Sequence, residues 1–177
     1  MRLTPILSVC ALLSLAACAP GFVAEVKGET TVPAGPPGVS SLLEAFPSVA
    51  GFSGMDFNQN QDFKNQGISK DQVSSAKLKS IQLKIVSPAD QDFSFLDTLE
   101  FSVKAGDREV PVARKASIPP GLKTLEMDLL DVELQPFLTA PTMTLSVRGK
   151  GRMPSREVRL EANVKLDVQV RLGPSGS

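Results

Sequence analysis

The sequence has no histidine, tryptophan or tyrosine, and only two of its 177 residues are cysteine. Without histidine, it has no imidazole to act as a general base, to complete a nucleophilic triad or to ligate a metal. The 19 basic residues are balanced by 19 acidic ones, so no excess of positive charge is available for displacing counterions from nucleic acid. We therefore expect neither a histidine-dependent enzyme nor a nucleic-acid-binding protein, and we expect no cofactor.

The N-terminus begins with Met1-Arg2 and continues as an apolar run, Leu3 to Leu15. This run is too short for a membrane-spanning helix, which needs about 20 residues. It is typical of a signal peptide, which we place at residues 1–17. The run ends in Leu15-Ala16-Ala17-Cys18, with two small residues directly before the cysteine. This segment resembles the lipobox of bacterial lipoproteins, and the alternative is an ordinary secretory signal peptide.

The resemblance covers residues 1–19 and implies that Cys18 is acylated and becomes the mature N-terminus. Acyl chains on Cys18 would anchor the protein to a membrane without a spanning helix. Residue 19 is Ala rather than Asp, which by the same resemblance implies the outer membrane, on either its periplasmic or its outer side. Cys10 would be lost with the signal peptide, leaving no disulfide and no free thiolate. Residues 18–21 are expected to form a short tether.

The clearest structural signal lies between residues 157 and 172. Every even position from Val158 to Leu172 is apolar and every odd position is polar, which predicts a strand with one buried face. The run exceeds the usual strand length of about 3–10 residues, so we expect a bend near Asn163 or a strand shared by two sheets.

Shorter alternating runs predict further strands, whose apolar positions are Phe22, Ala24 and Val26; Ile81, Leu83 and Ile85; Leu99, Phe101 and Val103; Leu125, Met127 and Leu129; and Met143, Leu145 and Val147. Leu78 is out of phase with Ile81, which predicts a bulge at residues 79–80. Pro111 indicates an edge strand. Turn signals separate the runs, among them Gly149-Lys150-Gly151.

This pattern predicts a single all-β domain over residues 22–172, an antiparallel β-sandwich that is immunoglobulin-like in general architecture. Capping patterns at residues 41–44 and 69–72, and a non-alternating stretch at 131–138, predict one to three short helical turns. Residues 173–177 are expected to be a disordered tail.

One candidate metal site is Asp56, Asn58, Asn60 and Asp62, at a spacing of two residues. Carboxylate and amide oxygens at this spacing are typical of a calcium loop. The similarity ends where Gln61 replaces the turn glycine and Gly67 replaces the bidentate glutamate. The alternative is a polar strand face, with no metal bound.

A candidate partner-docking segment is the apolar stretch 39–52, in which Leu42, Leu43 and Phe46 stand out. The alternative is a lid that closes one end of the sandwich. Asp90, Asp92 and Asp97 lie beside Phe93 and Phe95 and could serve a glycan site or a carboxylate-based hydrolase. The alternative is a solvated loop whose phenylalanines pack into the core.

The sequence thus favours a non-enzymatic, lipid-anchored envelope protein whose β-sandwich is an interaction or structural module. A ligand-binding module for glycan or calcium is the first alternative, and a carboxylate-based hydrolase is the second. We expect the membrane as one partner, through Cys18, and an envelope protein as another.

Overall fold

The computed structural model describes residues 20–37, 42–43 and 46–171. The predicted signal peptide (1–17), Cys18 and the predicted tail (173–177) lie outside the described residues.

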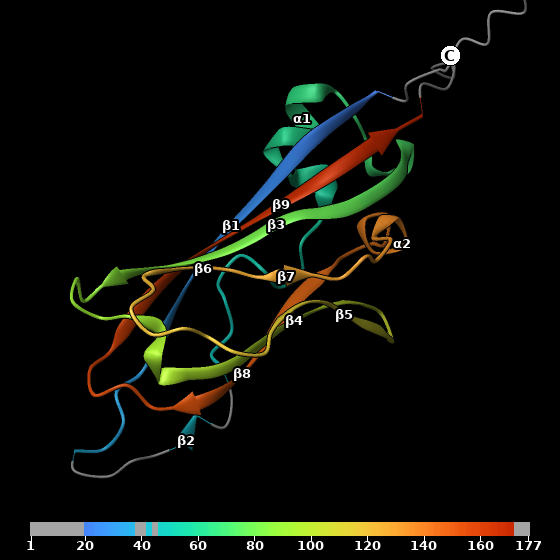
Figure 1. Ribbon diagram of the computed structural model, residues 1–177. Coiled ribbons are helices and arrows are strands. Elements are labelled where there is room, and N and C mark those ends of the chain that lie inside the picture. The colour runs from blue at the N-terminus through green and yellow to red at the C-terminus, as the bar shows by residue number, and fades with distance from the viewer. Residues whose placement is uncertain (1–19, 38–41, 44–45, 172–177) are drawn as a thin grey trace, which may run out of the picture.

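The chain forms two antiparallel sheets that pack face to face (Figure 1). Sheet A contains, in spatial order, β1 (Gly21–Val32), β9 (Val158–Val170), β3 (Val73–Ser87) and β6 (Thr124–Glu126). Sheet B contains β2 (Leu42–Leu43), β8 (Thr144–Arg152), β4 (Leu96–Ala105), β5 (Arg108–Lys115) and β7 (Asp128–Leu129). A hydrophobic core fills the space between them, because the apolar positions of the alternating runs point inward from both sheets.

The helical segments described are short: η1 (Phe57–Gln59), α1 (Gln61–Gln66), η2 (Lys70–Gln72), η3 (Phe93–Phe95) and α2 (Gln135–Leu138). The predictions of helical turns at 69–72 and within 131–138 are confirmed by η2 and α2. The predicted fold class, an all-β antiparallel sandwich with short helical turns, is confirmed.

The long alternating run forms β9, a strand in the interior of sheet A. It pairs with β1 in unbroken register from Gly21 opposite Gln169 to Val32 opposite Val158. The prediction that this run is shared by two sheets is wrong, because both of its edges are occupied within sheet A, by β1 and β3. The register shifts lie in β3 instead, and one falls between Leu78 and Ser80, where the bulge is predicted.

The predicted strand around Leu125, Met127 and Leu129 is divided between the sheets. β6 pairs with β3 in sheet A, whereas β7 pairs with β5 in sheet B. Leu125 and Met127 are buried, but Leu129 is 38% exposed, so the interpretation of the run as a single strand with one buried face is wrong. The chain crosses the edge of the sandwich here, so alternation along the sequence no longer corresponds to one sheet face.

The prediction of a turn at Gly149-Lys150-Gly151 is also wrong, because β8 continues through these residues to Arg152. Gly151 lies between Leu43 of β2 and Leu96 of β4. A Cβ atom at Gly151 would clash with the carbonyl oxygen of Phe95 and lie 2.8 Å from the Cα atom of Leu96. Glycine is therefore needed here for close approach of two backbones.

Pro111 lies in β5 opposite Ser102 of β4, next to a register shift. The far side of β5 pairs with β7 only at Ala113 and Arg114. Pro111 therefore has no strand partner on that side among the described residues. The predicted edge strand is wrong for β5 as a whole, because β7 pairs outside it and is the outer strand of sheet B.

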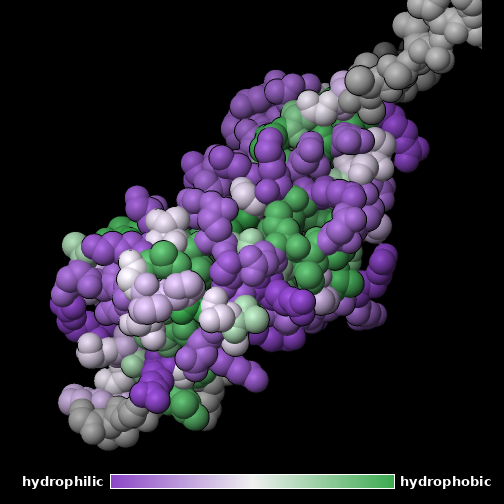
Figure 2. All heavy atoms as spheres, viewed as in Figure 1, coloured by the Kyte–Doolittle hydropathy of each residue, from purple (hydrophilic) through white to green (hydrophobic). Residues whose placement is uncertain are grey.

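The two ends of the sandwich differ. At one end, β1 begins and β9 finishes beside α1 (Figure 1). At the opposite end lie β2, the segment after β1 and the connection between β8 and β9. Here Gly35 N–H donates a 2.9 Å hydrogen bond to the carbonyl oxygen of Pro154. Hydrophilic residues cover most of the face seen in Figure 2, and hydrophobic ones show mainly between the two sheets.

Candidate functional sites

The four residues considered as a calcium loop surround η1 and α1, and an oxygen of each side chain accepts a hydrogen bond from a protein N–H group. Asp56 caps η1 by accepting from Asn58 N–H at 3.1 Å. Asn60 caps α1 by accepting from Asp62 N–H at 2.9 Å. Among the described residues, no group of three or more acidic, histidine or cysteine side chains could hold a metal ion. Asp56 and Asn60 therefore serve as helix caps, whereas Asn58 accepts from Lys70 N–H at 2.9 Å and Asp62 accepts from Glu25 N–H.

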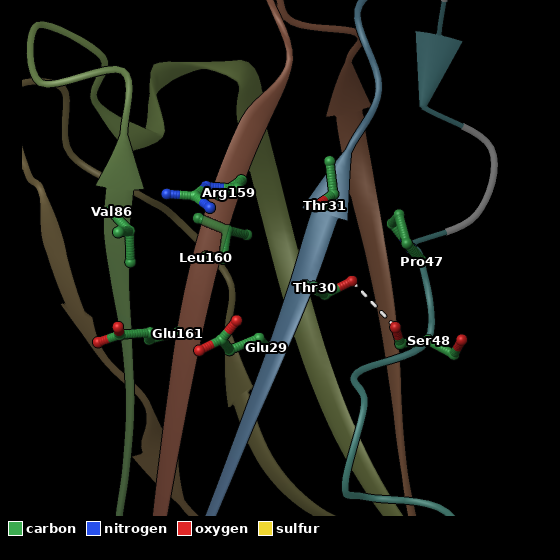
Figure 3. Close-up of a pocket in the computed structure, with 9 residues that line it drawn as sticks. All are labelled: Glu29, Thr30, Thr31, Pro47, Ser48, Val86, Arg159, Leu160 and Glu161. Atoms are coloured by element: carbon green, nitrogen blue, oxygen red, sulfur yellow. Dashed lines mark hydrogen bonds between the residues drawn. The ribbon is translucent and has the colours of Figure 1, made fainter.

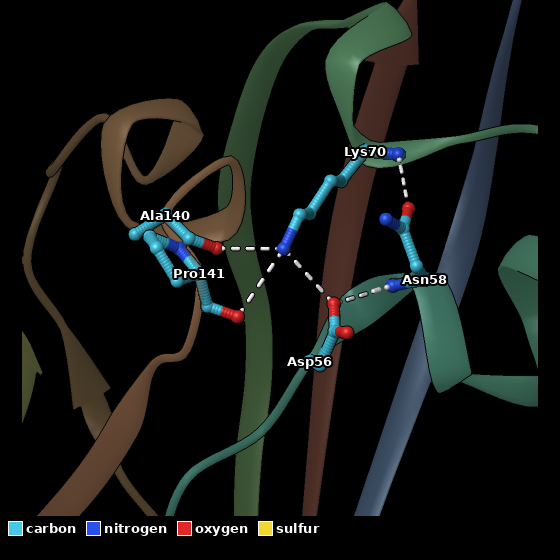
Figure 4. A network of polar contacts seen from close by, with 5 residues as sticks. All are labelled: Asp56, Asn58, Lys70, Ala140 and Pro141. Carbon is cyan, nitrogen blue, oxygen red and sulfur yellow. Dashed lines mark hydrogen bonds and ion pairs between the residues drawn. The ribbon is translucent and has the colours of Figure 1, made fainter.

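The ammonium group of Lys70 lies beside this loop in an oxygen-rich position (Figure 4). It donates hydrogen bonds to Asp56 Oδ1 at 3.0 Å and to the carbonyl oxygens of Ala140 at 2.9 Å and Pro141 at 3.2 Å. Its side chain is only 11% exposed. Hydrogen bonding to Lys70 holds the pKa of Asp56 below its usual value. The loop therefore already holds a cation, supplied by the chain itself, which ties the loop to the segment before β8.

Asn60 and Asp62 also satisfy the outer edge of β1. Glu25 N–H donates to Asp62 Oδ2 at 2.7 Å, and Asn60 Nδ2 donates to the Glu25 carbonyl at 3.2 Å. Because β1 is an outer strand of sheet A, these side chains take the place of a neighbouring strand at Glu25. Phe63 holds α1 in position, with its ring 5.0 Å from that of Phe22 in an edge-to-face arrangement. Sequence reasoning missed this role because Glu25 lies 37 residues before Asp62.

The candidate docking segment is mostly buried. Leu43 is 5% exposed and Phe46 is 7% exposed, whereas Leu42 is 71% exposed. The prediction of a helical turn at 41–44 is wrong for Leu42 and Leu43, which form β2 against Arg152 and Gly151 of β8. Pairing with an adjacent strand overrides the local capping pattern. Among the described residues of this segment, Leu42 is the one large hydrophobic residue that is exposed.

A polar pocket of about 440 Å³ lies over sheet A (Figure 3). Glu29 of β1 and Glu161 of β9, in register with each other, both line it, together with Arg159. Two opposed carboxylates are the arrangement that an acid–base hydrolase uses. Glu161 is, however, also in register with Lys84 of β3, so the next position in this row of the sheet is a cation.

Asn163 lies one row away on the same face and lines an adjoining pocket of about 490 Å³. Its Nδ2 donates to Glu25 Oε1 at 2.6 Å, which lowers the pKa of Glu25. Its buried Oδ1 has no hydrogen-bond partner among the described residues. In the described part of the chain, Asn163 Oδ1 is thus the one buried side-chain polar atom without a hydrogen-bond partner.

Sheet B carries a pocket of about 580 Å³ with a cationic lining. Its basic lining residues are Arg114, Lys115, Arg148 and Lys150. Glu100 is its one acidic lining residue, and Phe46 contributes apolar surface. The volume is in the range of small-ligand sites. Lys115 and Arg148 are paired with Asp128 and Glu109, so Arg114 and Lys150 supply the positive charge that favours an anionic ligand. Sequence reasoning missed this pocket because its residues come from three strands and a loop.

The acidic cluster at 90–97 is used in loop structure. Asp92 caps η3 and accepts a 2.7 Å hydrogen bond from Gly121 N–H. Asp90 pairs with Arg156 at 2.7 Å. Hydrogen bonds from Ser94 to Asp92, and from Arg156 to Asp90, lower the pKa of both carboxyls, which is the opposite of what a general acid requires. Phe93 and Phe95 are buried, which confirms that they pack into the core.

Among the described helices, none is long and apolar enough to cross a membrane. No family model and no curated protein matches the chain. Solved structures similar to it include "Crystal structure of decameric BFDV Capsid Protein", with a TM-score of 0.44 and 10% identity over 87% of this chain and 100% of that one. Another is the 60-mer BFDV capsid protein, with a TM-score of 0.40 and 8% identity over 90% of this chain and 98% of that one. "Desmodium yellow mottle tymovirus" has a TM-score of 0.22 and 8% identity, covering 99% of this chain and 96% of that one. Likeness at these scores carries no information about function.

Proposed function

We propose that the protein is a non-enzymatic, lipid-anchored envelope protein whose β-sandwich acts as an interaction or structural module. The observation that carries the proposal is Leu15-Ala16-Ala17-Cys18 directly after the apolar run. Acyl chains on Cys18 would hold the sandwich at a membrane, and Ala19 favours the outer membrane. Two or more chains are needed for durable binding, because a single chain binds only reversibly.

The chemistry of the described residues supports a role without catalysis. Each carboxyl with a shifted pKa, namely Glu25, Asp56, Asp90, Asp92 and Glu133, has that pKa lowered and is held by hydrogen bonds. A general acid at neutral pH needs a raised pKa instead. The absence of histidine removes the commonest alternative.

The direct test is intact-mass spectrometry of the membrane-purified protein, with Cys18→Ala as the matched control. The proposal expects loss of residues 1–17, added acyl mass on the wild-type chain only, and release of the control from the membrane. A wild-type chain that retains residues 1–17 or carries a free Cys18 thiol would refute the anchor. In-cell crosslinking of the acylated protein would then identify an envelope partner, with Leu42→Ser as a test of the exposed residue of β2.

A ligand-binding module is the second candidate, favoured by the cationic pocket of sheet B. An acidic glycan would suit its charge, whereas a neutral one would depend on the apolar lining residues, among them Phe46, Val147 and Ala116. Calorimetric titration with an acidic and a neutral oligosaccharide distinguishes the two, with Arg114→Gln and Lys150→Gln as test variants and Lys104→Gln as the control. A calcium titration at millimolar concentration tests the oxygen-rich loop in the same way, and absence of heat would exclude it.

A further inference from the structure

The described structure begins close to the proposed anchor. The carbonyl of Pro20 accepts a 3.0 Å hydrogen bond from Val170 N–H, and Gly21 is already in register with Gln169. Two residues of chain, fully extended, span at most about 7 Å. Cys18 is therefore within about 7 Å of Pro20, whose carbonyl is bonded to the last residue of β9.

The end of the sandwich next to Pro20 carries α1, and α1 is firmly attached there. Phe63 is fully buried against Phe22, and Asp62 bonds the backbone of Glu25. The η2 segment is joined to the same end, because Arg171 N–H donates to the carbonyl of Gln72 at 2.9 Å. The tether therefore meets a fixed surface rather than a loose loop.

The outward surface of α1 is polar. Its exposed residues are Gln61, Lys64, Asn65 and Gln66. Such side chains suit the headgroup layer and do not favour insertion into hydrocarbon. The most exposed large hydrophobic residue described, Leu42, lies at the opposite end, in β2.

We propose that the sandwich stands end-on, with α1 against the headgroups of the membrane that holds the acyl chains and with the β2 end directed away from it. This inference rests on the proposed acylation of Cys18. β9 has 13 residues, and at about 3.3 Å per residue it spans about 43 Å. The β2 end is then held about 40 Å from its own membrane, where an opposing envelope component can reach it.

The experiment uses two single-cysteine probes in the acylated protein, Gln66→Cys on α1 and Ser155→Cys in the exposed connection between β8 and β9. The thiol of Cys18 is blocked by acylation, and Cys10 is removed with the signal peptide, so each variant carries one reactive thiol. Each is labelled with a fluorophore and reconstituted in phosphatidylethanolamine–phosphatidylglycerol vesicles that contain a quencher attached to the lipid headgroup.

The expected result is strong quenching of the label at residue 66 and little or none at residue 155. Equal quenching at both positions would mean that the sandwich lies flat, and stronger quenching at 155 would mean the reverse orientation; either overturns the inference. Intact mass recorded on the same samples separates the two proposals. Acylated protein with neither label quenched overturns the orientation alone, whereas unacylated Cys18 overturns the proposed function and the orientation with it.

Discussion

Replacing Gly151 by alanine tests the interpretation of this glycine as a point of close backbone approach. Gly151 lies inside β8, and the added Cβ atom would press on the backbone of Phe95 and Leu96 in the neighbouring chain segment. Backbone atoms cannot move aside as the end of a flexible side chain can. Leu43 pairs on the other side of Gly151, so β8 cannot shift in that direction without disturbing β2.

The expected cost follows from these contacts. Overpacking costs about 1–3 kcal/mol, and loss of two ladder hydrogen bonds beside Gly151 adds about 1 kcal/mol each. The free energy of unfolding should therefore fall by about 3–5 kcal/mol, from a total that is about 5–15 kcal/mol for a domain of this kind. Gly54→Ala is the matched control, because a Cβ atom there meets nothing within 4 Å and the cost is limited to its positive φ of 63°, about 1 kcal/mol.

The measurement is urea unfolding of the Cys18→Ala chain followed by far-UV circular dichroism. Intrinsic fluorescence is unsuitable because the chain has neither tryptophan nor tyrosine. If Gly151→Ala loses no more stability than Gly54→Ala, β8 does not pack as closely as described and the reasoning is refuted.

Three further predictions concern edges, acid stability and the apolar segment. Asp62→Ala should expose the main-chain N–H of Glu25 at the edge of β1 and promote self-association, detectable by sedimentation velocity; a variant that remains monomeric at high concentration would contradict edge protection. Burial alone would raise the pKa of Glu133, but hydrogen bonds from Ala76 N–H, the Ser75 hydroxyl and Gln135 N–H outweigh it and lower this pKa below its usual value of 4.5. The stability that Glu133 contributes is therefore present above pH 4.5 and is lost as the pH falls through its lower folded-state pKa. Glu133→Gln should therefore weaken the fall of the unfolding free energy at acidic pH, measured by urea titration at several pH values. An unchanged pH dependence would contradict the lowered pKa of Glu133. Leu43→Ser should lower the melting temperature sharply, since truncating a buried leucine costs about 2–5 kcal/mol, while Leu42→Ser should leave it nearly unchanged. Equal melting temperatures for the two variants would contradict the burial of Leu43.

The faces of the strands could be predicted from the sequence because alternation is a local signal of one-sided burial. β9 reads as one uninterrupted pattern, and the phase change between Leu78 and Ile81 locates a bulge in β3. The neighbours of each strand could not be predicted, because pairing depends on segments far apart in the chain. Gly151 illustrates this limit: glycine is typical of turns, and only the approach of Phe95 shows why it occurs within a strand.

The candidate sites were predictable to a smaller extent. The regular spacing of Asp and Asn between residues 56 and 62 is visible in the sequence. Their hydrogen-bond donors Glu25 and Lys70 are not, because no local pattern marks these two residues. The cationic pocket of sheet B is assembled from three strands and is invisible until they are placed side by side. Cys18, in contrast, is proposed as the lipidation site from the sequence alone, because the residues that carry the proposal, Leu15-Ala16-Ala17-Cys18, are continuous in the chain.

The central position of β9 has a consequence for how the protein folds. β9 provides the pairing surface for both β1 and β3, yet it is the last strand of the described chain. The partner of Val32 in β1 is Val158 in β9. During synthesis from the N-terminus, β1 therefore cannot pair with β9 until more than 120 further residues have been made. Sheet A can therefore form only after β9 has been made, and its formation depends on long-range contacts that fold slowly. Until β9 has been made, β1 therefore has no partner strand in sheet A among the described residues, and β1 and β3 are not yet joined.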